Sequence, residues 1–211
     1  MRHWLAAGLV AAAACESAVA PRRLNLFSYA DTVAGQRVVF HWPGSYLPIR
    51  YYAYPDAPLP ELVRGGLARW EAQFLYGEFR AVLVTDSAQA DVIVAFQGAA
   101  PPPAEPDTVE AVAACEGLTA PIVAGTTLER PLRVSLRPLS GFTPGQVAAC
   151  IERVTLHELG HTLGLFNQAH AGADVTDLMY AFPRVYEPGA RDRATVEVLY
   201  HTVPTVSPAP R

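Results

Sequence analysis

A long helix is the most constrained feature of this sequence, because the residue types at both of its ends favour one set of boundaries. Thr143 is a favourable N-cap, Pro144 suits the first helical position, and Gly164 suits the residue that follows the last turn. The residue types therefore predict one continuous helix between these ends. It carries His157 and His161, so the chemistry of the chain has to be built around this helix.

His157 and His161 are four residues apart, which places them on one face of the helix, about 6 Å apart at Cβ. Two imidazoles at this spacing can bind one zinc ion. Glu158 is turned about 100° round the helix from His157, so its carboxylate can reach a metal-bound water without binding the metal. Such a carboxylate can take the proton of the water as it attacks a peptide carbonyl. The pattern predicts a zinc endopeptidase with Glu158 as the catalytic general base. An exposed helix face with two solvated histidines is the alternative.

The remaining pattern predicts a single α+β domain. Segments rich in β-formers predict strands, and apolar residues at helical spacing predict one helix before the long helix and one after it. The expected strands cover residues 49–54, 79–84, 90–96 and 132–136, and the expected outer helices cover residues 60–77 and 189–201. We place the domain at residues 37–203, with a tether at 16–36 and a flexible tail at 204–211.

The residues around and beyond the histidine pair are more specific than the pair itself. Residues 157–165 read His-Glu-Leu-Gly-His-Thr-Leu-Gly-Leu, and residues 177–180 read Asp-Leu-Met-Tyr. These stretches, with the order of expected elements over residues 48–201, resemble the matrixin-type metzincin peptidases. The resemblance implies a zinc endopeptidase with a twisted mixed sheet, an active-site helix, a C-terminal helix and a substrate cleft between the sheet and the helical part.

The same resemblance gives roles to two residues of the downstream stretch. Met179 would be the Met-turn residue, a hydrophobic base beneath the zinc, and it can fill a gap in the core at the same time. Tyr180 would lean toward the metal and stabilise an oxyanion, or else belong to the core or the cleft wall.

The sequence departs from this family at the third metal ligand. The family has a histidine three residues after Gly164, but Asn167 stands there, and an amide oxygen is a poor zinc ligand beside imidazole. His170 follows three residues later and precedes Met179 by nine, close to the separation that the family keeps. The expected third ligand is therefore His170, and the alternatives are Asn167, Asp174 and Asp177.

Composition limits the class of protein and of partner. Hydrophobic residues make up 51% of the 211-residue chain and charged residues 17%, which favours a compact globular domain. All 16 basic residues are Arg, the net charge is -4, and no stretch gathers the basic residues into a stripe. The composition therefore argues against a nucleic-acid partner. We expect a monomer that acts on a protein or peptide substrate.

Residues 1–15 have the pattern of a bacterial export signal, with a short positive start, an apolar run and Cys15. The run is too short to span a bilayer as a permanent helix. Residues 12–15, Ala-Ala-Ala-Cys, resemble a lipobox, so we expect lipidation of Cys15 and membrane contact only through this anchor. Cleavage after Ala20, with loss of a free cysteine, is the alternative. Both versions predict an exported protein, either a cell-envelope lipoprotein or a secreted one.

Two cysteines remain once Cys15 is set aside. Cys115 and Cys150 form an even pair in an oxidising compartment, which predicts a disulfide between them. Two separate buried thiols are the alternative.

Two other functions stay open at this point. The first is an inactive zinc-binding relative that acts as a protein- or peptide-binding surface lipoprotein. The second is an adhesive or structural surface lipoprotein whose histidine pair is incidental.

Overall fold

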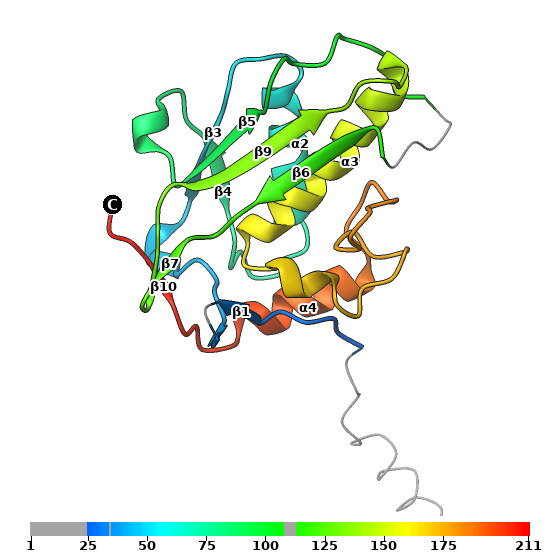
Figure 1. Ribbon diagram of the computed structural model, residues 1–211. Helices are drawn as coiled ribbons and strands as arrows, with labels where there is room; N and C mark the ends of the chain where they lie inside the picture. The colour runs from blue at the N-terminus through cyan, green and yellow to red at the C-terminus, as the bar shows by residue number, and fades with distance from the viewer. Residues whose placement is uncertain (1–24, 34, 108–112) are drawn as a thin grey trace, which may run out of the picture.

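The computed structural model describes residues 25–33, 35–107 and 113–211, and a five-stranded mixed sheet forms one layer of the fold (Figure 1). The strand order is β4, β3, β5, β9 and β6. The first four strands run parallel, and β6 lies antiparallel to β9 at one edge. In the same order, the strands span Ala81–Leu83, Ile49–Ala53, Val92–Phe96, Leu132–Pro138 and Cys115–Thr119.

One face of the sheet is apolar, because buried side chains alternate along β3, β5 and β9. The register sets Tyr51 beside Val92 and Val92 beside Leu132, so these side chains form a row across the sheet. Helices α2 (Leu59–Glu71) and α3 (Pro144–Thr162) pack side by side against the sheet (Figure 1). With the C-terminal helix α4 (Ala190–Tyr200), this arrangement confirms the α+β fold.

Helix α3 has the boundaries that its residue types predict. Thr143 Oγ1 accepts the backbone N–H of Gln146 at 3.1 Å, and Gln146 Oε1 accepts the N–H of Thr143 at 3.0 Å, which completes a capping box. Gly164 has a φ of 109°, and a Cβ there would lie 1.9 Å from a backbone oxygen, so only glycine fits this turn. Trp70 Nε1 donates to the carbonyl oxygen of Leu156 at 2.9 Å and ties α2 to α3.

Helix α2 is shorter than the sequence predicts, because it ends at Glu71 and not at Gly77. The Glu71 carboxylate accepts the backbone N–H of Ala81 in β4 at 2.6 Å, across the loop of residues 72–80. Leu75, which lies inside the predicted helix, is 73% exposed, whereas Phe74 is buried in the core. The segment after α2 therefore keeps an apolar side chain in the core without being helical.

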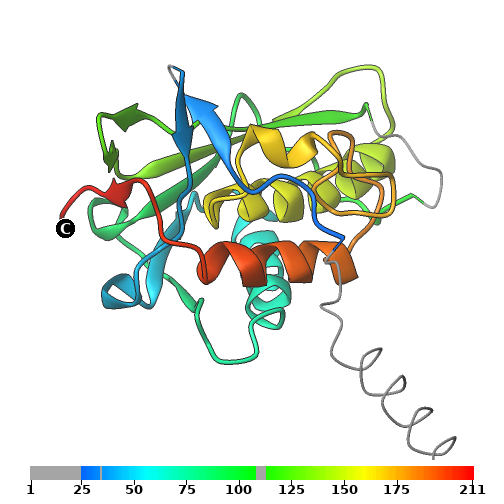
Figure 2. The same ribbon diagram turned by 90° about the horizontal axis from the view of Figure 1, so that it is seen from below.

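The first residues that the structure describes, from residue 25 on, pack on the domain, although the sequence predicts a tether up to residue 36. Phe27 is buried, and the N–H of Ser28 donates to the carbonyl oxygen of Ala171 at 3.5 Å. Strands β1 (Asp31–Val33) and β2 (Gln36–Val38) pair as a hairpin, and β1 lies against the turn that follows α3 (Figure 2). Burial of the apolar ring of Phe27 favours the packing of this segment on the domain.

Residues 204–211, for which a flexible tail is predicted, also pack against the domain. Val206 is buried, and the Arg211 guanidinium lies 2.8 Å from the buried Asp91 carboxylate. A buried apolar side chain, an ion pair and backbone hydrogen bonds, such as that from the Thr205 N–H to the Val39 oxygen at 2.9 Å, therefore hold this segment. The remaining short elements are η1 (Gly44–Tyr46), η2 (Ser87–Gln89), β7 (Val123–Ala124), β8 (Thr127–Leu128) and β10 (Ser207–Pro208), of which β10 pairs with β8 and β8 with β7.

A disulfide joins Cys115 in β6 to Cys150 in α3, which confirms the predicted pair. It ties the edge strand to the helix that carries two of the histidines. Among the residues that the structure describes, no helix is both long enough and apolar enough to cross a membrane. Cys15 and the predicted signal lie outside the described residues, so the lipid anchor stays a prediction.

Candidate metal centre

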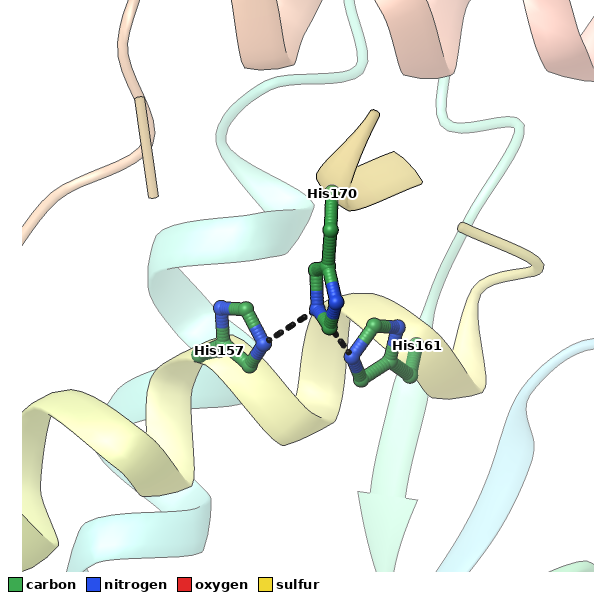
Figure 3. A group of neighbouring side chains, drawn as sticks. All are labelled: His157, His161 and His170. Carbon is green, nitrogen blue, oxygen red and sulfur yellow. Dashed lines mark hydrogen bonds between the residues drawn. The ribbon is translucent and has the colours of Figure 1, made fainter. Parts of the chain in front are cut away.

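Three histidines come together beside the last turns of α3. His157 and His161 extend from the helix, and His170 extends from η3 (Asn167–His170), the short 3-10 helix that follows it (Figure 3). The Nε2 atom of His170 lies 3.1 Å from Nε2 of His157 and 3.2 Å from Nε2 of His161. The ligand atoms of the three residues all lie within 4.8 Å of one another. The fold thus unites the three histidines that the sequence singles out.

Hydrogen bonds assign the tautomer of the two helical imidazoles. His157 Nδ1 donates to the carbonyl oxygen of Leu178 at 2.7 Å, and His161 Nδ1 donates to the carbonyl oxygen of Leu165. Because a carbonyl oxygen only accepts, each neutral ring carries its proton on Nδ1, and its Nε2 lone pair points toward the centre. Nitrogens bound to one tetrahedral metal ion at 2.0 to 2.1 Å lie about 3.3 Å apart, so the separations of 3.1 and 3.2 Å are of the size that such an ion requires.

Burial keeps the imidazoles neutral. It lowers the pKa of His157 from 6.5 to about 4 and the pKa of His161 well below 6.5, and the neighbouring imidazoles act in the same direction. Burial also lowers the pKa of His170, although the carboxylate of Asp31 opposes this shift. Neutral imidazole is the form that binds a metal, so the site is ready for one at neutral pH.

The structure brings His170 into the cluster and none of the three alternatives. Asn167 is exposed, although it lies in the same turn. Asp174 is exposed and lies 3.2 Å from the Arg191 guanidinium, and Asp177 is buried and lies 2.6 Å from the same guanidinium. The turn of η3 therefore brings His170, and not Asn167, against the two helical histidines.

Glu158 lies beside the cluster in a cleft of about 190 Å³, whose lining includes Gly117, His157, His170 and Phe182. Its side chain is buried, and burial raises its pKa from 4.5 to about 7. A hydrogen bond from Thr119 acts in the opposite direction. A carboxyl group with this pKa can both accept and release a proton near neutral pH.

Met179 is fully buried and packs against α3. A Cβ at Gly160 would lie 2.5 Å from the Met179 sulfur, so the glycine allows the thioether to touch the helix backbone. Asp192 of α4 holds this turn, because its carboxylate accepts the N–H groups of Leu178 at 3.0 Å, Met179 at 3.2 Å and Gly189 at 2.7 Å. The Met-turn role of Met179 stays a prediction.

Tyr180 is partly buried, and its ring centroid lies 6.5 Å from that of Phe182, which lines the cleft. Its role at an oxyanion stays a prediction.

Sequence reasoning does not identify Thr119, Gly117 or Asp192 as part of the site. An acid three residues after Gly189, where a helix begins, is a signal that could have found Asp192. Thr119 and Gly117 have no such signal, because the pattern does not predict β6.

No protein-family model matches this sequence, and no curated protein is significantly similar to it. The function of the chain therefore has to be inferred from the geometry of its site. It shows three histidines that could hold a metal ion, placed on and after a helix that packs against a mixed sheet.

Proposed function

We propose that this protein is a zinc-dependent endopeptidase similar to the matrixin-type metzincins. The observation that carries the proposal is the convergence of three histidine Nε2 atoms beside a buried glutamate, Glu158. Imidazole suits zinc, as it also suits copper, iron and nickel, and the open tetrahedral arrangement is the reason to propose zinc. Three protein ligands leave the fourth position of a tetrahedral ion open, which is the arrangement of a catalytic zinc site.

Glu158 is the general base of the proposed reaction. A bound zinc ion supplies Lewis acidity, which acidifies water and polarises a peptide carbonyl. Glu158 accepts the proton of the attacking water and returns it to the leaving amine. The same carboxyl group has to be a base first and an acid afterwards, and its buried position beside the cluster suits it to both transfers.

Strand β6 offers a substrate a place to bind. It is the last strand of the sheet, paired with β9 on one side, and its residues Cys115, Glu116 and Gly117 line the cleft that contains Glu158. An extended peptide can add to such an edge through its backbone. The proposed substrate is therefore a protein or peptide in extended form, lying along β6 and across the cluster.

Metal analysis and a cleavage assay test the proposal. We expect the purified protein to contain one zinc per chain by mass spectrometry and to cleave members of a broad peptide library. Glu158→Gln should keep the zinc and the fold while turnover falls about 10²- to 10⁴-fold, the usual contribution of a positioned acid–base group. His161→Ala should lose both zinc and activity.

Two results would contradict the proposal. Bound zinc without cleavage of any library member would favour the inactive relative that binds a protein or peptide. A chain that binds no zinc would favour an adhesive or structural role for this fold.

We also propose that the protein is exported and carries a lipid on Cys15. The Cys115–Cys150 disulfide supports an oxidising compartment. The mass of the N-terminal peptide from cells tests the anchor, and a lipid-modified Cys15 is expected. A mature chain that begins at Pro21 would contradict lipidation and leave export intact.

A further inference from the structure

Strand β6 lies alongside α3 and contacts the carboxylate of Glu158 through one hydroxyl group. Thr119, at the end of β6, is 2% exposed. Its Oγ1 lies 2.7 Å from Glu158 Oε2 and 3.3 Å from the backbone oxygen of the same residue. A hydroxyl has one hydrogen, so the shorter contact is the hydrogen bond. A hydrogen bond to a carboxylate is also the stronger kind.

The other oxygen of the carboxylate faces the same strand at a glycine. A Cβ built at Gly117 would lie 2.4 Å from Glu158 Oε1 and 2.5 Å from a methyl carbon of Val154. Any side chain at this position would therefore push the carboxylate away. The missing side chain of Gly117 and the hydroxyl of Thr119 together define the space that the carboxylate occupies.

This contact decides which oxygen of Glu158 is available. A glutamate side chain turns about three single bonds, and ordering it costs conformational entropy. With Oε2 bonded to Thr119, Oε1 is the oxygen left for a proton from the cleft. A base held in advance in this way does not have to be ordered during the reaction.

We propose that Thr119 is a positioning residue that holds Glu158 in its proton-accepting orientation, with Gly117 providing the space. This inference rests on the proposed function. Thr119 makes no described contact with the three histidines, so its effect should fall on turnover and leave the metal in place.

Thr119→Val tests the inference, because valine keeps the shape of threonine and removes the hydroxyl. We expect kcat to fall about 10- to 100-fold, the range for loss of one hydrogen bond to a charged group. KM and zinc content should stay as in the wild type. Thr119→Ser restores the donor and should recover kcat to within a few-fold of the wild type.

Two further variants separate positioning from a general effect on the core. Thr155→Val is the matched control, since Thr155 is equally buried in α3 and its hydroxyl has no hydrogen-bond partner among the described residues. It should leave kcat unchanged. Gly117→Ala should lower kcat with zinc retained, because the added methyl group displaces Glu158. It keeps the inference testable if Thr119→Val does not fold.

The outcomes distinguish this inference from the function on which it rests. An active wild type with equal kcat in Thr119→Val overturns the positioning role alone. A loss in Thr119→Val that is matched by Thr155→Val, or that Thr119→Ser does not recover, also overturns it. A wild type that holds zinc and cleaves nothing overturns both.

Discussion

His170 differs from the other two histidines in how the chain supports it. His157 and His161 share the rigid frame of α3, and a backbone carbonyl fixes the ring of each. His170 comes from a turn of four residues and is only partly buried. The N–H of Ser28 reaches the residue after it, Ala171, from the N-terminal segment. The position of the third imidazole therefore depends on a contact with a distant part of the chain.

The affinity for zinc should show whether His170 is a ligand. His170→Ala removes a donor atom, so we expect a loss greater than the roughly 10- to 100-fold that follows removal of a ligand's hydrogen-bond partner. Asn167→Ala is the matched control in the same turn and should leave the affinity unchanged. Competition with a chromophoric chelator measures both variants. Unchanged affinity in His170→Ala, together with a loss in Asp174→Ala, would transfer the third ligand to Asp174.

At the scale of elements, the disulfide joins β6 to α3, and both of these elements line the cleft. Cys115 in β6 and Cys150 in α3 are 35 residues apart in sequence. On the loop-closure model, a cross-link of this length stabilises the fold by about 3 to 4 kcal/mol. The Cys115→Ser, Cys150→Ser double variant should lose stability of that order in urea denaturation. Free-thiol titration of the denatured, unreduced wild type should find neither of these two cysteines reactive, and two reactive thiols there would refute the bond.

Elements with strong local signals could be predicted, and elements defined by their neighbours could not. Helix α3 has a capping residue at one end and a glycine at the other, so its boundaries are local information. Strand β6 reads Cys-Glu-Gly-Leu-Thr, and only pairing with β9 makes it a strand. The place of Thr119 in the site could not be predicted for the same reason, because Thr119 belongs to β6. The spacing between His170 and Met179 predicts His170 as the third ligand, whereas the η3 turn that positions His170 depends on packing.

At the scale of the whole molecule, one buried carboxylate connects distant parts of the chain. The Asp91 side chain is fully buried and lies 2.6 Å from the Arg130 guanidinium, 2.8 Å from that of Arg211 and 3.4 Å from that of Arg50. Arg50 belongs to β3, Arg130 precedes β9, and Arg211 comes from the C-terminal segment. Asp91 therefore holds the sheet and the C-terminal segment together. Removal of one partner of a buried ion pair destabilises the fold, because the other partner is left as an uncompensated buried charge.

The charge on Asp91 should also set part of the acid stability. Burial raises the pKa of this carboxyl, but hydrogen bonds from Arg211 and Arg50 and the charge of Arg130 lower it more, so it lies below 3.8. In the unfolded chain the group returns to its ordinary pKa. Between the two values the unfolded state binds more protons, so stability rises with pH in that window. The contribution is complete above pH 3.8 and is lost as the pH falls through the folded-state pKa.

Asp91→Asn should therefore destabilise the protein in a pH-dependent way. We expect a loss of about 3 to 5 kcal/mol at pH 7, because three guanidinium groups would face a neutral amide. The difference from the wild type should shrink as the pH falls below 3.8, where the wild type loses the same charge. Glu61→Gln is the control, since Glu61 pairs with Arg64 at 3.8 Å and both side chains are exposed, at 69% and 65%. A surface pair of this kind contributes at most about 1 kcal/mol. Urea denaturation at pH 7 and pH 3 measures all three proteins. Equal stability of Asp91→Asn and the wild type at pH 7 would contradict a stabilising role for the negative charge of Asp91.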